Sequence, residues 1–227
     1  MKENICTIPI NDIFRERGGC PVCRMYRMAE QQYIDYITGP AMMAPDVRVV
    51  TNEVGFCHRH LSQMIAHGPR LSVALLLQTH LDEVRTRLLP SSSVPSRSRS
   101  EGIARLQDTC YVCDRIEHDI LHLMQTVYAQ YGADEEFRRL YGEQDCLCLQ
   151  HYALVMAGAS KKTVDKHYLN DFVAVTNRLC KGYLDTLCDD VTAFTRLFDY
   201  RSAGMDPGSS KDAIERAAQF LHGDISG

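Results

Sequence analysis

The chain has 227 residues, 45% hydrophobic and 24% charged, an ordinary composition for a globular protein with a packed core. A formal net charge of −4 argues against nucleic-acid binding, which calls for a basic face. Residues 1–10 lack the apolar core of a secretory signal, and the longest apolar run, Val73 to Leu77, is too short to cross a bilayer. We therefore expect a cytoplasmic protein without a membrane span, whose ten cysteines serve metal binding or catalysis rather than disulfides.

The first predicted unit, residues 1–89, begins with a C-x-x-C motif at Cys20 and Cys23 that opens a segment of helical periodicity. A second helix is expected from Asp46, and a C-x-x-H motif follows at Cys57 and His60. The long helix that comes next is predicted from a stripe of mostly apolar residues at helical spacing, Leu71, Leu75, Gln78, Leu81, Val84 and Leu88.

Residues 90–104 are rich in Ser and Pro and are expected to form a flexible linker. Residues 105–203 then repeat the order of the first half, with C-x-x-C at Cys110 and Cys113 and C-x-x-H at Cys148 and His151. Cys57 follows Cys23 by 34 positions and Cys148 follows Cys113 by 35, so the halves agree to within one position. This agreement indicates an internal repeat.

Helical periodicity continues through the second half. A stripe at Ile116, Ile120, Leu123, Val127 and Tyr131 predicts a helix after the second C-x-x-C, and a longer helix is expected over about 163–199. A short tail helix over 211–221 is expected within residues 204–227. No stretch alternates apolar and polar residues, so the predicted fold class is all-α, a tandem duplicated helical unit with one long second-half helix.

The two motifs of each half together supply three thiols and one imidazole. Structural zinc takes four such ligands in a tetrahedron, and two donors three positions apart can converge on one ion from a helix start. Helix N-termini also favour thiolate. Repeat register therefore predicts two zinc ions, one held by Cys20, Cys23, Cys57 and His60 and the other by Cys110, Cys113, Cys148 and His151. Iron–sulfur clusters are the alternative, since they too accept thiolate-rich ligand sets.

Other cysteines and histidines fall outside this register. Cys146, two positions before Cys148, is either a free thiol without a role, a substitute ligand or a redox-active thiol beside the site. His118 and His122 lie opposite the apolar face of their helix and are expected to face solvent, and His58 is expected to be exposed or to lie behind the ligands. Cys180 and Cys188 are expected to be core or interface residues of the long helix, and Cys6 has no partner in the repeat.

The motifs, with Gly55-Phe56 before Cys57 and the late segment Phe198-Asp199-Tyr200-Arg201, resemble a family of small helical proteins of anaerobic bacteria. That family is classed as a domain of unknown function and is sometimes labelled as an ABC-transporter substrate-binding protein. The resemblance covers the chain from about Cys20 to the tail and implies no established activity. Cys146-Leu147 replaces the Gly-Phe pair in the second half, which leaves the turn before Cys148 open.

Two function classes follow. The first is a metal-stabilised structural or interaction protein without evident catalysis, because closed four-ligand sites leave no open position and no catalytic motif is visible. The second is an iron–sulfur or redox accessory protein that uses the same eight residues, and a dithiol enzyme is a further variant of it. The long second-half helix either braces both halves or pairs with an unidentified protein partner or a second copy.

Overall fold

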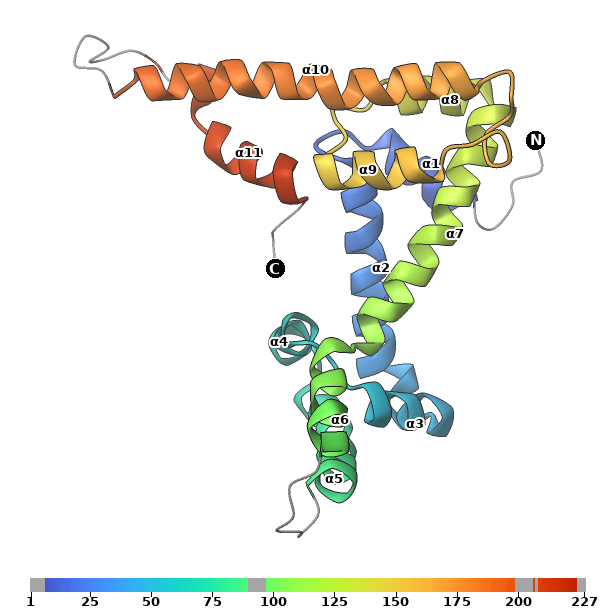
Figure 1. The fold of residues 1–227 in the computed structure, drawn as a ribbon, viewed down its shortest axis with the longest axis vertical. Coiled ribbons are helices and arrows are strands. Elements are labelled where there is room, and N and C mark those ends of the chain that lie inside the picture. The colour runs from blue at the N-terminus through green and yellow to red at the C-terminus, as the bar shows by residue number, and fades with distance from the viewer. Residues whose placement is uncertain (1–6, 90–96, 199–205, 207, 224–227) are drawn as a thin grey trace. The chain divides into compact units, whose positions relative to one another are not determined.

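The computed structural model describes residues 7–89, 97–198, 206 and 208–223, and within them the chain is helical, with no strand (Figure 1). The predicted all-α class is thus confirmed. Gly and Pro separate the early helices, and Pro stands at the start of several of them. In chain order the first half forms α1 (Thr7–Arg15), α2 (Pro21–Thr38), the 3-10 turn η1 (Pro40–Met43), α3 (Pro45–Val54), α4 (His58–His67), α5 (Arg70–Glu83) and the π-helical turn η2 (Val84–Leu88).

The second half is also helical. It consists of α6 (Arg97–Asp108), α7 (Tyr111–Ala133), α8 (Glu135–Gly142), α9 (Leu149–Gly158), α10 (Leu169–Arg196), the 3-10 turn η4 (Gly208–Ser210) and α11 (Ala213–His222). The helix α10 stands where the long helix is predicted, and α11 stands where the tail helix is predicted. Within the described residues no helix has the length and apolarity needed to cross a bilayer.

The fold divides into two units that do not follow the sequence halves. Described residues up to 26 and from 121 onward form unit 1, and described residues of 27–120 form unit 2. The division falls inside α2 and inside α7, so each of these helices contributes to both units. The boundaries of the repeats themselves, 1–89 and 105–203, remain a prediction from sequence.

Unit 1 is built around an aromatic core. Phe14 of α1 packs edge-on against Phe137 at 5.0 Å between ring centroids and stacks on Tyr141 at 5.6 Å. Tyr141 is fully buried and its hydroxyl hydrogen bonds to Thr176 of α10 at 2.9 Å, which satisfies the phenol within the core. The tail helix α11 packs against α9 and α10 (Figure 1), where Arg216 pairs with Asp190 at 2.8 Å.

In unit 2, α3, α4 and η2 each pack against α5. The stripe predicted for α5 is not the buried one, because Leu71 and Leu81 are exposed, whereas Val73 and Leu76 are buried. The run LSVALLL spreads apolar residues around most of the helix, so periodicity alone does not select a face there.

The predicted linker also differs from the structure. Residues 97–104 form the beginning of α6 rather than a flexible connection, and residues 90–96 lie outside the described residues. The pair Arg97–Glu101, four positions apart at 2.9 Å, is an interaction that supports a helix there despite the serines.

Candidate metal centres

Unit 1 gathers four potential metal ligands: Cys20, Cys23, Cys148 and His151. The Nδ1 atom of His151 lies 3.6, 3.3 and 3.1 Å from the Sγ atoms of the three cysteines, in that order. The Sγ atoms of Cys23 and Cys148 are 3.8 Å apart. All four residues are buried, with Cys148 only 2% exposed.

Unit 2 gathers the other four: Cys57, His60, Cys110 and Cys113. Here the Nδ1 atom of His60 lies 3.3, 3.2 and 3.4 Å from the Sγ atoms of Cys57, Cys110 and Cys113. The Sγ atoms of Cys57 and Cys113 are 3.9 Å apart. His60 and Cys110 are buried, whereas Cys57 and Cys113 are partly exposed.

The pairing of motifs is nested, and the predicted pairing within each half is wrong. The first C-x-x-C meets the last C-x-x-H in unit 1, and the two inner motifs meet in unit 2. All eight predicted ligand residues lie in the two clusters, but each cluster draws one motif from each half. The helix after each C-x-x-C supplies the physical reason. The 18 residues of α2 extend for about 27 Å, so a motif at the start of α2 is carried away from the motif that follows it.

Each cluster lies where two helices begin. Cys57 caps the N-terminus of α4 and Cys148 that of α9, with nearly identical backbone angles (φ −68° and ψ 163°, against φ −66° and ψ 159°). Cys20 and Cys110 directly precede α2 and α7. Backbone N–H groups and the positive ends of two helix dipoles therefore face the thiols of each cluster, which favours the thiolate form that binds metal.

The distances fit one tetrahedral ion per cluster. With Zn–S bonds near 2.3 Å, the edge between two sulfurs of a zinc tetrahedron is about 3.8 Å, and sulfur–nitrogen edges are slightly shorter. The Sγ–Sγ distances of 3.8 and 3.9 Å match this edge, and all donor atoms of a cluster lie within 4.8 Å of one another. The chemistry of the donor set, three sulfurs and one imidazole nitrogen, is also that of structural zinc sites.

The two histidines are held differently. Glu30 of α2, itself largely buried, accepts a hydrogen bond from His60 Nε2 at 2.9 Å and pairs with Arg59 at 3.0 Å. Desolvation opposes ionisation of Glu30, but the hydrogen bonds from His60 and Gln63 and the charge of Arg59 outweigh it and lower its pKa. In unit 1 the ring of His151 instead stacks on Tyr26, with centroids 5.0 Å apart and planes 19° apart.

Electrostatics in the metal-free clusters favour charged imidazole beside thiolate. Burial alone would lower the pKa of His60, but Cys110 and Glu30 outweigh it and raise the pKa to about 10. Burial is likewise outweighed at His151, where the three thiols raise the pKa to about 12. A hydrogen bond from Cys113 lowers the pKa of Cys110. Both clusters thus favour a protonated imidazole, and in unit 2 the Sγ atom of Cys110 is favoured in its negative form.

Cys146 is the second-half residue that corresponds to Gly55, and the turn before each C-x-x-H motif explains why the two residues differ. Gly55 has φ +66°, and its carbonyl accepts a hydrogen bond from the N–H of Tyr111, the residue after Cys110. The corresponding residue after Cys20 is Pro21, which has no N–H to donate. No described residue other than glycine has positive φ, so Cys146 takes an ordinary backbone conformation.

In unit 1, side-chain hydrogen bonds join the segment before the C-x-x-C motif to the segment before the C-x-x-H motif. The buried guanidinium of Arg24 donates to the carbonyl oxygens of Ile13, Glu16, Gly18 and Gly19 and to Gln144 Oε1. Gln144 in turn donates to the carbonyl oxygen of Phe14 at 2.6 Å, and the N–H of Gly18 donates to Asp145 at 2.6 Å. These bonds tie the loop before Cys20 to the loop before Cys148. Sequence reasoning missed Glu30, Arg24 and Gln144, because a single polar residue in a helix or a loop carries no periodic signal.

The remaining candidates from the sequence lie outside the two clusters. Cys148, not Cys146, joins Cys20 and Cys23 as the third thiol of the unit 1 cluster. Cys146 is buried nearby, where desolvation and the charges of Cys20 and Cys148 raise its pKa. Cys180 is buried in α10, Cys188 is exposed, and His58, His118 and His122 are exposed as expected. Cys6 lies outside the described residues.

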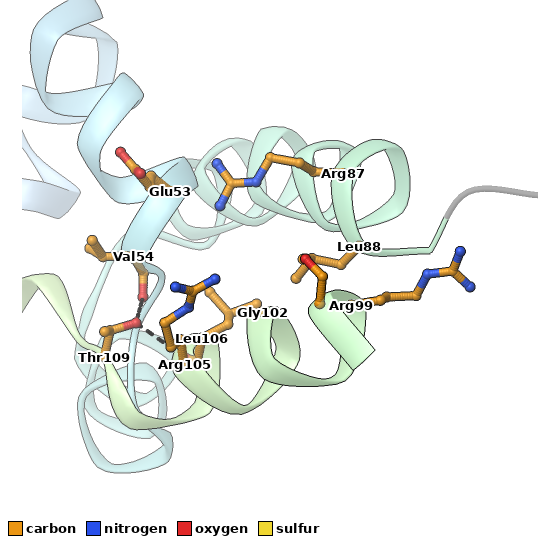
Figure 2. A pocket seen from close by; sticks show the side chains of 10 residues that line it. Glu53, Val54, Arg87, Leu88, Arg99, Gly102, Arg105, Leu106 and Thr109 are labelled. Atoms are coloured by element: carbon orange, nitrogen blue, oxygen red, sulfur yellow. Dashed lines mark hydrogen bonds between the residues drawn. The ribbon is translucent and has the colours of Figure 1, made fainter. Parts of the chain in front are cut away.

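Unit 2 also has a cleft of about 620 Å³ beside the segments that hold its cluster. Figure 2 shows Arg87 and Arg105 reaching toward it from facing helices, and Thr109 donating to the carbonyl oxygen of Val54 at 2.8 Å. It is lined by Glu53, Val54, Arg87, Leu88, Ser98, Arg99, Gly102, Arg105, Leu106 and Thr109. None of these is a Cys or His, so the cleft adds no ligand of the kind found in the clusters.

The whole chain, residues 1–227, matches the profile of a family of unknown function, DUF6062, and the protein belongs to this family. The membership in a family of unknown function that the motifs predict is thereby confirmed. Neither the curated proteins nor the solved structures contain a significant match to the chain.

Proposed function

We propose that this protein binds two zinc ions and uses them to fasten its helices together, in a structural or interaction role. The observation that carries the proposal is the presence of two separate sets of three thiols and one imidazole, each with its donor atoms within 4.8 Å of one another. Two such sets on one chain would be costly to keep without an ion, because thiolates packed this closely repel each other.

Zinc is favoured over an iron–sulfur cluster by the space between the donors. A cluster interposes several iron and sulfide atoms between its protein ligands, and each iron needs its own ligand. Donor atoms that lie within 4.8 Å of one another enclose room for one ion, not for such a core. A single tetrahedral ion that accepts thiolate and imidazole is the better fit, and zinc is the usual occupant of such sites.

A structural role follows from the closed ligand set. Four protein donors complete a zinc tetrahedron and leave no position for water or substrate. Each ion would connect distant parts of the chain, since Cys23 and Cys148 are 125 positions apart and His60 and Cys110 are 50 apart. Metal binding of this kind contributes directly to folding free energy. The partner of an interaction role, another protein or a second copy, stays a prediction.

Metal analysis of the full chain purified without oxygen tests the proposal. We expect two zinc ions per chain, no visible absorption from iron–sulfur charge transfer, and a lower melting temperature after chelation. Cys188→Ser serves as the control variant, because this exposed cysteine lies outside both clusters and its loss should leave two ions bound. Iron with acid-labile sulfide would establish the alternative, and protein that folds identically without metal would refute the structural role.

A further inference from the structure

The two clusters differ in one respect that bears on their chemistry, which is access to solvent. In unit 1 all four ligand residues are buried, Cys20 and Cys23 at 6% and 7% exposure. In unit 2 the pair Cys57 and Cys113 is partly exposed, although His60 and Cys110 behind it are buried. Oxidation of cysteine depends on thiolate character and on exposure, so the two clusters should not react alike.

The sulfur–sulfur distances are nearly the same in the two clusters, so exposure to solvent is the property that should make them react differently. Each has one pair of sulfurs from different motifs at nearly the same distance, 3.9 Å for Cys57 and Cys113 and 3.8 Å for Cys23 and Cys148. Either pair could close to a disulfide by a movement of about 2 Å, since the S–S bond is about 2.05 Å. Only the pair in unit 2 can be approached from solvent.

We propose that Cys57 and Cys113 are a modification site at which a peroxide forms a disulfide and expels the metal of unit 2. This inference rests on the proposed zinc binding. One thiolate attacks the peroxide, takes an oxygen atom to become a sulfenic acid and releases an alcohol or water. The second thiolate attacks the sulfenic sulfur, the S–S bond forms, and the oxygen leaves as water after protonation. Two thiolates lose two electrons in total, and the peroxide gains them.

Loss of these two thiolates releases the ion without separating the segments. Only Cys110 and His60 would remain as ligands, half of the original set. The new disulfide would join positions 56 apart, so the two inner motifs would stay linked by a covalent bond in place of the metal. A thiol reductant would reverse the bond by exchange and restore the site. Unit 2 would thus respond to peroxide while unit 1 kept its ion.

The test follows zinc release from the full-length zinc-loaded protein exposed to hydrogen peroxide, with a chromogenic chelator present. We expect one of two ions to leave at least about tenfold faster than the other, together with a disulfide mapped by mass spectrometry to Cys57 and Cys113. Treatment with a thiol reductant and added zinc should restore binding of the released ion. Equal release rates, or a first disulfide between Cys23 and Cys148, would overturn the inference.

Two double variants provide matched controls. Cys23→Ser with Cys148→Ser removes ligands of unit 1 and should leave one ion that peroxide releases at the fast rate. Cys57→Ser with Cys113→Ser should leave one ion that resists peroxide. Zinc content measured before the oxidant is added tests zinc binding separately from the oxidation site. Fewer than two ions on the unaltered chain would contradict zinc binding itself. Two ions that leave together contradict only the oxidation site.

Discussion

The carboxylate of Glu30 lies 2.9 Å from Nε2 of His60, while the Nδ1 atom of the same ring faces three thiols. A carboxylate that accepts the Nε2–H bond fixes the tautomer in which Nδ1 is free to bind metal. His151 has an aromatic ring, Tyr26, against its face instead. The two centres therefore have the same donors but different support.

Removal of this support should weaken one site selectively. Glu30→Ala is expected to lower the metal affinity of unit 2 by about 10–100-fold, because the imidazole loses its fixed orientation and part of its basicity. Competition with a chelator of known affinity measures the effect. Asp35→Asn, an exposed change on the same helix, should leave both affinities unchanged. An equal loss at both sites would show that Glu30 acts through general stability rather than through His60.

Nested pairing makes a stoichiometric prediction that the pairing within halves does not. Cys23→Ser with Cys148→Ser removes two ligands from one cluster, so one ion should remain bound. Cys23→Ser with Cys57→Ser removes one ligand from each cluster, so both ions should be bound weakly or lost. Zinc content after gel filtration, with circular dichroism to verify helicity, distinguishes the cases. If pairing followed the halves, the two results would be exchanged.

Metal affinity should rise with pH over a wide range. The pKa of His60 is raised to about 10 in the metal-free protein and that of His151 to about 12. Below these values a proton occupies the ring and must leave before a metal binds, so acid weakens binding and each ion releases protons as it enters. Calorimetric titration at pH 7 in buffers of different ionisation enthalpy counts these protons. A proton count near zero would contradict the charged imidazoles.

The turn at Gly55 should be intolerant of a side chain. Its φ of +66° is unfavourable for alanine, and a Cβ there would lie 2.9 Å from the ring of His80 and 3.3 Å from Leu106. Gly55→Ala is expected to destabilise the protein by about 1–3 kcal/mol, measured by denaturant unfolding of the zinc-loaded form. Gly182→Ala is the matched control, because a Cβ in α10 meets nothing within 4 Å and should be neutral or stabilising.

Sequence alone predicted the eight residues that gather in the two clusters, because the spacing between two cysteines, or between Cys and His, is a local property. Three positions on the first turn of a helix place both side chains on one ion, whatever the rest of the fold does. The all-α class and the buried positions Ile116, Ile120 and Val127 were equally local, since they depend on the period of one helix. These features could be predicted and are found.

The pairing of motifs could not be predicted in this way. Spacings of 34 and 35 positions look alike in both halves, and any C-x-x-C is chemically complementary to any C-x-x-H. Only the direction and length of α2 and α7 decide which motifs meet, and these are tertiary properties. The buried face of α5 was missed for the same reason, because packing against neighbouring helices selects it.

Nesting also sets an order of events on the ribosome. The inner centre is complete in sequence once His60 and Cys113 have emerged, whereas the thiols of Cys20 and Cys23 must wait for His151. Before Cys110 emerges, Cys57 and His60 are the first donors that Cys20 and Cys23 can meet, so under the proposed zinc binding a nascent chain can hold the ion in this non-native set. Synthesis from the N-terminus therefore offers a competing ligand set before the native ones are complete. A trapped ion has to exchange between thiolates before the native centres can form.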